Sequence, residues 1–87
     1  MGQRRARAQI IYDVLYECLN GVGVTHLMYG ANLSYSTLRK YLVAMSKQGL
    51  ISKTVGGNGL GLYHTTQKGR VLLDELRNVK DYLNIDG

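Results

Sequence analysis

The chain has 87 residues, a single cysteine, no proline, a net charge of +5 and a pI near 9.6. This length allows one domain, and one cysteine excludes an internal disulfide framework and suits a reducing cytoplasm. Its cysteine and two histidines lack the spacing of a metal site, and no apolar run approaches the ~20 residues of a membrane span, so we expect a cytoplasmic protein with no metal, cofactor or membrane partner.

Two helices are expected in the first third of the chain. Apolar residues recur at helical spacing in RARAQIIYDVLYECLNG, residues 5–21, and Gly21 is a suitable stop. Residues 24–31 predict a short second helix, with Thr25 as its N-cap and Gly30 near its end.

The third helix, residues 34–48, has the clearest boundaries. Ser34 is a suitable N-cap, and Leu33 and Leu38 have the spacing of a hydrophobic staple around it. Gly49 predicts the end of the helix. The residues expected on its inward face are Leu38, Tyr41, Leu42 and Met45.

A glycine-rich segment, VGGNGLGLYHTT, follows the third helix and has two interpretations. A dinucleotide-type phosphate cradle needs G-x-G-x-x-G between a strand and a helix, whereas these glycines lie between two alternating segments, 50–55 and 62–65. No Gly-Lys-Ser/Thr follows, which excludes a P-loop. The segment therefore predicts a hairpin whose tip uses glycines and Asn58 at positive φ, and Thr66 then caps a last helix.

The expected fold is mainly α with a small β-hairpin (α+β), a winged helix-turn-helix with a long C-terminal helix. Residues 1–65 would form the DNA-binding unit and residues 66–87 a helix that belongs to the same single domain. In this arrangement the third helix enters the major groove of DNA, and the hairpin, or wing, reaches the neighbouring backbone or minor groove.

Charge favours a polyanionic partner. Between Leu19 and Leu73 every charged residue is basic. With the apolar face inward, Ser36, Lys40, Val43 and Lys47 point outward and Arg39 lies on the flank. Phosphate contacts are expected from Lys47, Lys53, Lys68 and the first arginines. The full set of candidate double-stranded DNA contacts is Arg5, Arg7, Ser34, Tyr35, Ser36, Thr37, Arg39, Lys40, Lys47, Lys53 and Asn58.

The stretch THLMYGANLSYSTLRKYLVAMSKQGLI, with IIYDVL before it and YHTTQKG after it, resembles an archaeal winged-helix family. The family includes small 10a-type DNA-binding proteins and archaellum-regulator-like domains. The resemblance implies duplex DNA binding, as a regulator or a chromatin component, with a reading helix at 34–48 and a wing at 53–64. It also implies that the helix from Thr66 pairs with a second copy as an antiparallel coiled coil. The chain departs from its relatives at 22–24, where it has Val-Gly-Val and they often have lysines.

The last helix independently suggests a homodimer. Its apolar residues Leu72, Leu76, Val79 and Leu83 follow the 4-3-4 spacing of a coiled-coil seam. Because two heptads are shorter than a secure coiled coil, packing of this helix on its own domain stays open as an alternative.

Two other classes of function compete with DNA binding. A winged helix can serve as a protein–protein interaction module without DNA binding, to which Val43 and Ala44 on the outward face point weakly. An enzyme is not expected, because serines, histidines and acids show no nucleophile-and-base spacing and Cys18 lies on an apolar stripe. We therefore expect a non-catalytic regulator or nucleoid-associated protein.

Overall fold

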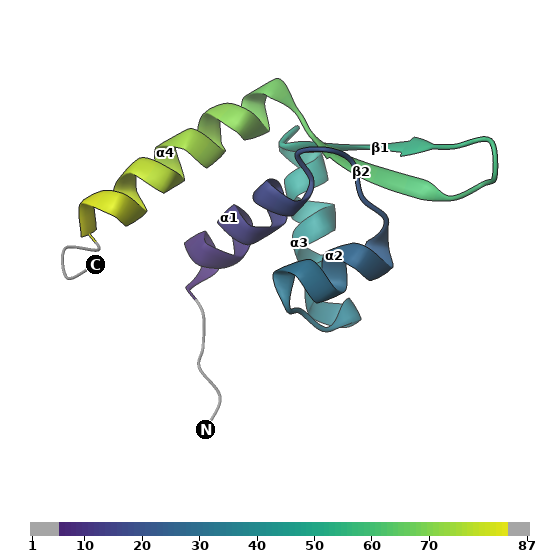
Figure 1. The fold of residues 1–87 in the computed structure, drawn as a ribbon, viewed down its shortest axis with the longest axis horizontal. Helices are drawn as coiled ribbons and strands as arrows, with labels where there is room; N and C mark the ends of the chain where they lie inside the picture. Colours follow the sequence, from purple (N-terminus) through teal and green to yellow (C-terminus); the bar gives the residue numbers. More distant parts are fainter. Residues whose placement is uncertain (1–5, 84–87) are drawn as a thin grey trace.

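The computed structural model describes residues 6–83, and their side chains as far as residue 79. Three helices form a compact body, a hairpin projects from it, and a last helix lies along the first and runs away from the hairpin (Figure 1). The elements are α1 (Arg7–Glu17), α2 (Val24–Ala31), α3 (Tyr35–Lys47), β1 (Ile51–Val55), β2 (Gly61–Thr65) and α4 (Gln67–Leu83). The predicted fold class, a winged helix-turn-helix with a long C-terminal helix, is confirmed.

The core is small and draws on every helix and on β1. Its buried apolar residues are Val14, Leu15, Cys18, Leu27, Ala31, Leu38, Leu42, Met45, Leu50, Ile51 and Leu73. Leu73 is the buried apolar side chain of α4 among those that the structure describes, and it does not belong to the predicted 4-3-4 pattern. The first turns of α4 therefore pack inward, around Leu73.

Three predicted helix boundaries are confirmed. The Ser34 hydroxyl accepts a hydrogen bond from the Thr37 amide at the start of α3, and Gly49 has a φ of 75° just after its end. The Thr66 hydroxyl accepts a hydrogen bond from the Gly69 amide at 3.0 Å and so caps α4.

The predicted extent of α2, residues 24–31, is confirmed, but its predicted N-cap is wrong. Gly23, and not Thr25, is the N-cap, because Val22 forms an isolated bridge with Tyr63 and holds the chain extended up to residue 23. Gly30 lies near the other end, as predicted, and the left-handed residue that follows the helix is Asn32, with a φ of 55°.

The hairpin is longer than a two-residue turn. The strands pair antiparallel from Ile51↔Thr65 to Val55↔Gly61. The Gly59 amide donates to the Gly56 carbonyl at 2.9 Å, and Gly59 has a φ of 81°. This is a turn followed by a left-handed glycine, so the expectation of a positive φ at the other glycines and at Asn58 was wrong.

The junction between β2 and α4 ties the domain together. The buried Thr65 hydroxyl donates to the Leu15 carbonyl of α1 at 2.7 Å. The next hydroxyl, of Thr66, donates to the Gly49 carbonyl at 2.6 Å, just after α3. A side chain at Gly69 would contact the Leu50 carbonyl, so α4 approaches the start of β1 as closely as a glycine allows.

Gly69→Ala is expected to lower the free energy of unfolding by about 1–3 kcal/mol or more, since its methyl group has no space against the Leu50 carbonyl. Gly57→Ala is the matched control, because Gly57 has open space and no positive φ. Urea denaturation followed by circular dichroism measures both variants. Equal stability of the two would contradict close packing at the junction.

Candidate nucleic-acid interface

The outward face of α3 has the composition expected from the sequence. Leu38, Leu42 and Met45 are buried, whereas the opposite side chains Ser36, Lys40, Val43 and Lys47 are exposed. No acidic residue lies in this helix. The face therefore presents two ammonium groups, a hydroxyl and an aliphatic side chain to any partner.

Hydroxyl groups at the start of α3 also have a structural role. The Ser34 hydroxyl lies 3.4 Å from the Thr37 amide and 3.2 Å from the Thr37 hydroxyl, and Thr37 is half-buried. Ser34 and Thr37 thus mainly hold the first turn of the helix. Tyr35 and Ser36 remain exposed, and they are the predicted contacts of this turn that a partner reaches most directly.

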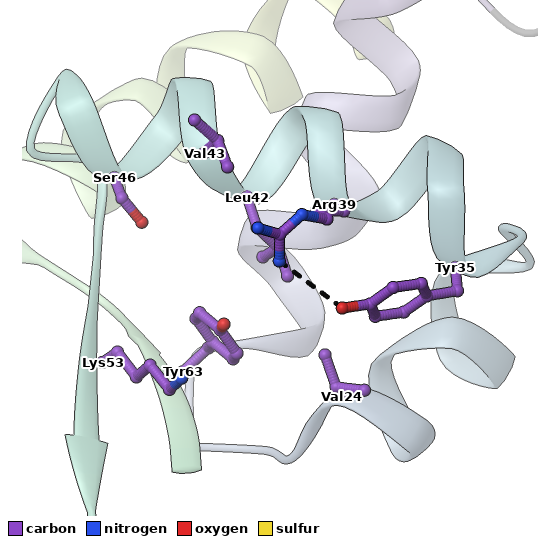
Figure 2. A pocket seen from close by; sticks show the side chains of 8 residues that line it. All are labelled: Val24, Tyr35, Arg39, Leu42, Val43, Ser46, Lys53 and Tyr63. Atoms are coloured by element: carbon purple, nitrogen blue, oxygen red, sulfur yellow. Dashed lines mark hydrogen bonds between the residues drawn. The ribbon is translucent and has the colours of Figure 1, made fainter.

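Arg39 points from α3 into the space between this helix and the hairpin (Figure 2). One of its Nη atoms lies 3.5 Å from the Tyr35 hydroxyl oxygen, the limit of a hydrogen bond. The space is a cavity of about 140 Å³. Its lining residues are Val24, Tyr35, Arg39, Leu42, Val43, Ser46, Lys53 and Tyr63, none of them acidic.

Lys53 lies on the hairpin wall of the same cavity. Its ammonium nitrogen is 5.6 Å from the centre of the Tyr63 ring, a cation–π distance. Its side chain crosses Gly61, where a Cβ would lie 2.5 Å from the Lys53 Cε atom. Lys53 on β1 and Arg39 on α3 were each predicted to contact DNA. The fold brings them to the same cavity.

Arg7 and Lys40 lie on the other flank of α3. Both line a groove of about 410 Å³ between α1, α3 and α4, whose floor is mostly apolar. Asn58 is exposed at the hairpin tip, where its side-chain oxygen accepts a hydrogen bond from the Leu60 amide at 3.1 Å. Arg5 lies outside the described residues.

Lys68, one of the expected phosphate contacts, also has a structural role. Its ammonium group donates to the Gln48 carbonyl at 2.8 Å and so satisfies the end of α3. The sequence contained a signal for this role, since a lysine that follows the cap of one helix can reach the last carbonyls of another. The partner helix, however, depends on the fold.

The predicted seam of α4 divides into two parts. Leu72 and Leu76 are half-buried and pack against the core, whereas Val79 is 52% exposed. The Leu83 side chain lies outside the described ones. Val71, which the heptad pattern did not select, is also exposed on this helix.

The cysteine and the two histidines lie apart, each in its own surroundings. Burial, with a smaller contribution from the Glu17 carboxylate, raises the pKa of the Cys18 thiol from 9.0 to about 12. His26 lies 3.9 Å from Glu17, and His64 shares a hydrogen bond of 3.1 Å with the Thr54 hydroxyl. No group of three metal-ligating residues occurs in the described part of the chain, and no helix there is long and apolar enough to cross a membrane.

Comparison with known proteins agrees with this geometry. Residues 4–84 match the winged helix-turn-helix family. The chain belongs to this family. The resemblance noted in the sequence is thereby confirmed, together with a likeness to Sso10a-2, a DNA-binding protein from Sulfolobus solfataricus. That structure has a TM-score of 0.83 and 28% identity, over 93% of this chain and 85% of the other.

Two further matches cover a smaller share of the other protein. An uncharacterised protein of Methanocaldococcus jannaschii is 32% identical over 77 residues, which are 87% of this chain and 34% of that protein, so the chain spans about a third of that relative. MepR, a transcription regulator of Staphylococcus aureus, superposes with a TM-score of 0.75 at 13% identity, over 93% of this chain and 62% of the other, and shows the fold alone.

The Cys18 thiol is expected to resist alkylation in the native protein near neutral pH, because its thiolate forms only near pH 12. The folded state keeps this proton and the unfolded state releases it, so the contribution of Cys18 to stability is lost as pH rises from 9.0 toward 12. A thiol-reactive dye measures the rate, with the urea-denatured chain as control. Equal rates in both states would contradict a buried thiol.

Proposed function

We propose that the protein is a non-catalytic double-stranded DNA-binding protein of the cytoplasm, either a transcriptional regulator or a nucleoid-associated protein. One observation carries this proposal. Residues 19–73 contain six basic side chains and no acidic one, and four of the six lie on α3 and the hairpin of a winged helix-turn-helix. A basic surface attracts polyanions in general. The exposed helix α3 adds a shape that the major groove of DNA can accommodate.

The first turns of α3 supply the proposed base contacts. Tyr35, Ser36, Arg39 and Lys40 are exposed there. The Arg39 guanidinium can pair with O6 and N7 of guanine. To do so it gives up its contact of 3.5 Å with the Tyr35 hydroxyl, which costs little at that distance.

The proposed phosphate contacts surround this helix. Lys53 approaches from the hairpin, Lys47 from the end of α3, and Arg7, together with Arg5, from the start of the chain. The Tyr63 ring holds Lys53 without neutralising its charge, so the ammonium group remains available to a phosphate. Phosphate contacts on both sides of α3 would fix the orientation of the protein on the duplex. They would not determine which base sequence it prefers.

The name of Sso10a-2 supports the proposal by analogy. That protein is described as DNA-binding, and its likeness to this chain extends over nearly the whole length at 28% identity. The regulators below 25% identity support only the architecture.

We further propose that residues 1–65 form the DNA-binding unit and that residues 66–87 pair two copies into a homodimer. Val71 and Val79 are about half-exposed on α4, and Leu72 borders the apolar groove beside α3. A second copy that covered these side chains would remove apolar surface that the single chain leaves in water. Pairing along α4 would place two copies of α3 on one duplex.

Binding to a duplex is expected to fall roughly 10³–10⁵-fold between about 50 and about 200 mM salt, for six to ten phosphate contacts in a dimer. Fluorescence anisotropy measures it. Arg39→Ala and Lys40→Ala should each weaken binding more than Arg70→Ala, which removes the same charge from an exposed position on α4. Weak, salt-insensitive binding by all four proteins would instead favour a protein-interaction module, for which the 44% exposed Val43 would be the first contact to test.

Val79→Asp is expected to convert a homodimer into a monomer of 9.7 kDa, since it places a charge in the proposed seam at a side chain that the single chain leaves 52% exposed. Asn78→Asp adds the same charge to an exposed neighbour off the seam and should leave the dimer intact. Light scattering measures both masses. A dimer that survives Val79→Asp would exclude this part of α4 from the interface.

A further inference from the structure

The tip of the hairpin is apolar and uncharged. From Thr54 to Tyr63 the chain has no charged residue, although this segment projects farthest from the helical body (Figure 1). Val55 is 66% exposed, Leu60 65% and Leu62 39%. Among the described residues none of these three packs against the core, so their exposure has no structural explanation within the single chain.

Hydrogen bonds hold Leu60 at the tip. Its carbonyl accepts from the Gly56 amide at 2.9 Å, and its own amide donates to the Asn58 side-chain oxygen at 3.1 Å. Gly59 and Gly61 flank it, so no neighbouring side chain along the strand covers it. The result is a single leucine on a narrow, backbone-lined ribbon.

This shape fits the minor groove of DNA, which is about 6 Å wide. We propose that the hairpin tip is an apolar wedge, in which Leu60 inserts between base pairs from the minor groove and kinks the duplex. The inference rests on the proposed DNA binding and adds to it a mode of contact. Leucine is one of the side chains that proteins use to unstack base steps in this way, with kinks on the order of 20–90°.

Three features favour DNA over a protein as the occupant. Lys53 stands at the base of the same hairpin and Arg39 faces it from α3, so phosphates on both sides of the groove would be neutralised. No acidic side chain between Leu19 and Leu73 would repel the backbone as the tip enters. Asn58 at the tip has an amide side chain, a type that reads base edges in the minor groove.

Val55 and Leu62 lie behind Leu60 on the two strands. In the wedge they would cover the sugars beside the opened step and keep water from it. Because pyrimidine–purine steps unstack most easily, the wedge would select TA and CA/TG steps through their deformability, without a hydrogen bond to a base.

The test combines two measurements on a short duplex with a central TA step. Energy transfer between dyes at its two ends measures the kink, and 2-aminopurine placed beside the step brightens when the base unstacks. Wild-type protein and Leu60→Met, which keeps an apolar side chain, should shorten the dye distance and brighten the 2-aminopurine. Leu60→Ser should lose both signals while keeping the salt slope of binding, because no charge has changed.

The outcomes separate the two proposals. If the wild type binds with a steep salt slope but gives neither signal, or if Leu60→Ser keeps both, the wedge is overturned and DNA binding stands. If Leu60→Ser loses both signals and light scattering shows that its oligomeric state has changed as well, the tip is a protein contact and the wedge is overturned. If the wild type binds no duplex, the proposed function fails and the wedge fails with it. Unchanged thermal unfolding of Leu60→Ser would show that the substitution acts at the exposed tip and not on the fold.

Discussion

Two consecutive threonine hydroxyls, at the point where the hairpin ends, hold the helices and the wing in one geometry. The Leu15 carbonyl lies in the last turn of α1, where carbonyls have no partner in their own helix, and the Gly49 carbonyl lies just after α3. The Thr65 hydroxyl donates to the first of these carbonyls and the Thr66 hydroxyl to the second. The bond from Thr65 is buried, and leaving the Leu15 carbonyl unsatisfied would cost about 1–3 kcal/mol, a large fraction of the stability of a domain this small. These bonds fix the position of the end of β2 relative to α1 and α3. The strand register from Ile51↔Thr65 outward then places the hairpin tip.

The same constraint positions the two cations that line the cavity between α3 and the hairpin. Arg39 and Lys53 face each other from elements that the threonine junction positions, and each rests on a tyrosine, one on a hydroxyl and the other on a ring. A salt bridge would hold these side chains equally well but would neutralise them. Neutral aromatic partners orient a cation and leave its charge to attract an anion. By contrast, Glu17 lies near His26, on α1 and α2 and away from this cavity.

Local features of the fold were predictable from the sequence because they depend on neighbouring residues. The Ser34 cap, the stop at Gly49 and the hairpin each follow from side chains within a few positions. The N-cap of α2 was mispredicted because Tyr63, some 40 residues away in β2, bridges to Val22, so that the helix begins directly after this bridge, with Gly23 as its N-cap.

Only part of the candidate site was predictable from the sequence. Helical periodicity sufficed to place Lys40 and Lys47 on the outward face of α3. It could not show that Lys68 ends α3, that Leu73 anchors α4, or that Lys53 and Arg39 share a cavity. Each of these depends on how elements distant in sequence meet, which the threonine junction decides and no local pattern reveals.

The division between a charged body and an apolar tip bears on which kind of DNA-binding role we propose. Contacts from lysines to phosphates supply affinity that is nearly independent of sequence. The outward face of α3 adds few groups that discriminate bases, since two of its four side chains are lysines and one is Val43. If the tip selects deformable steps, discrimination would come from the shape of the duplex more than from a code of hydrogen bonds. Deformable steps occur throughout any genome, so a protein built in this way would occupy many sites. Within our proposal, this favours a nucleoid-associated role over control of a single operator.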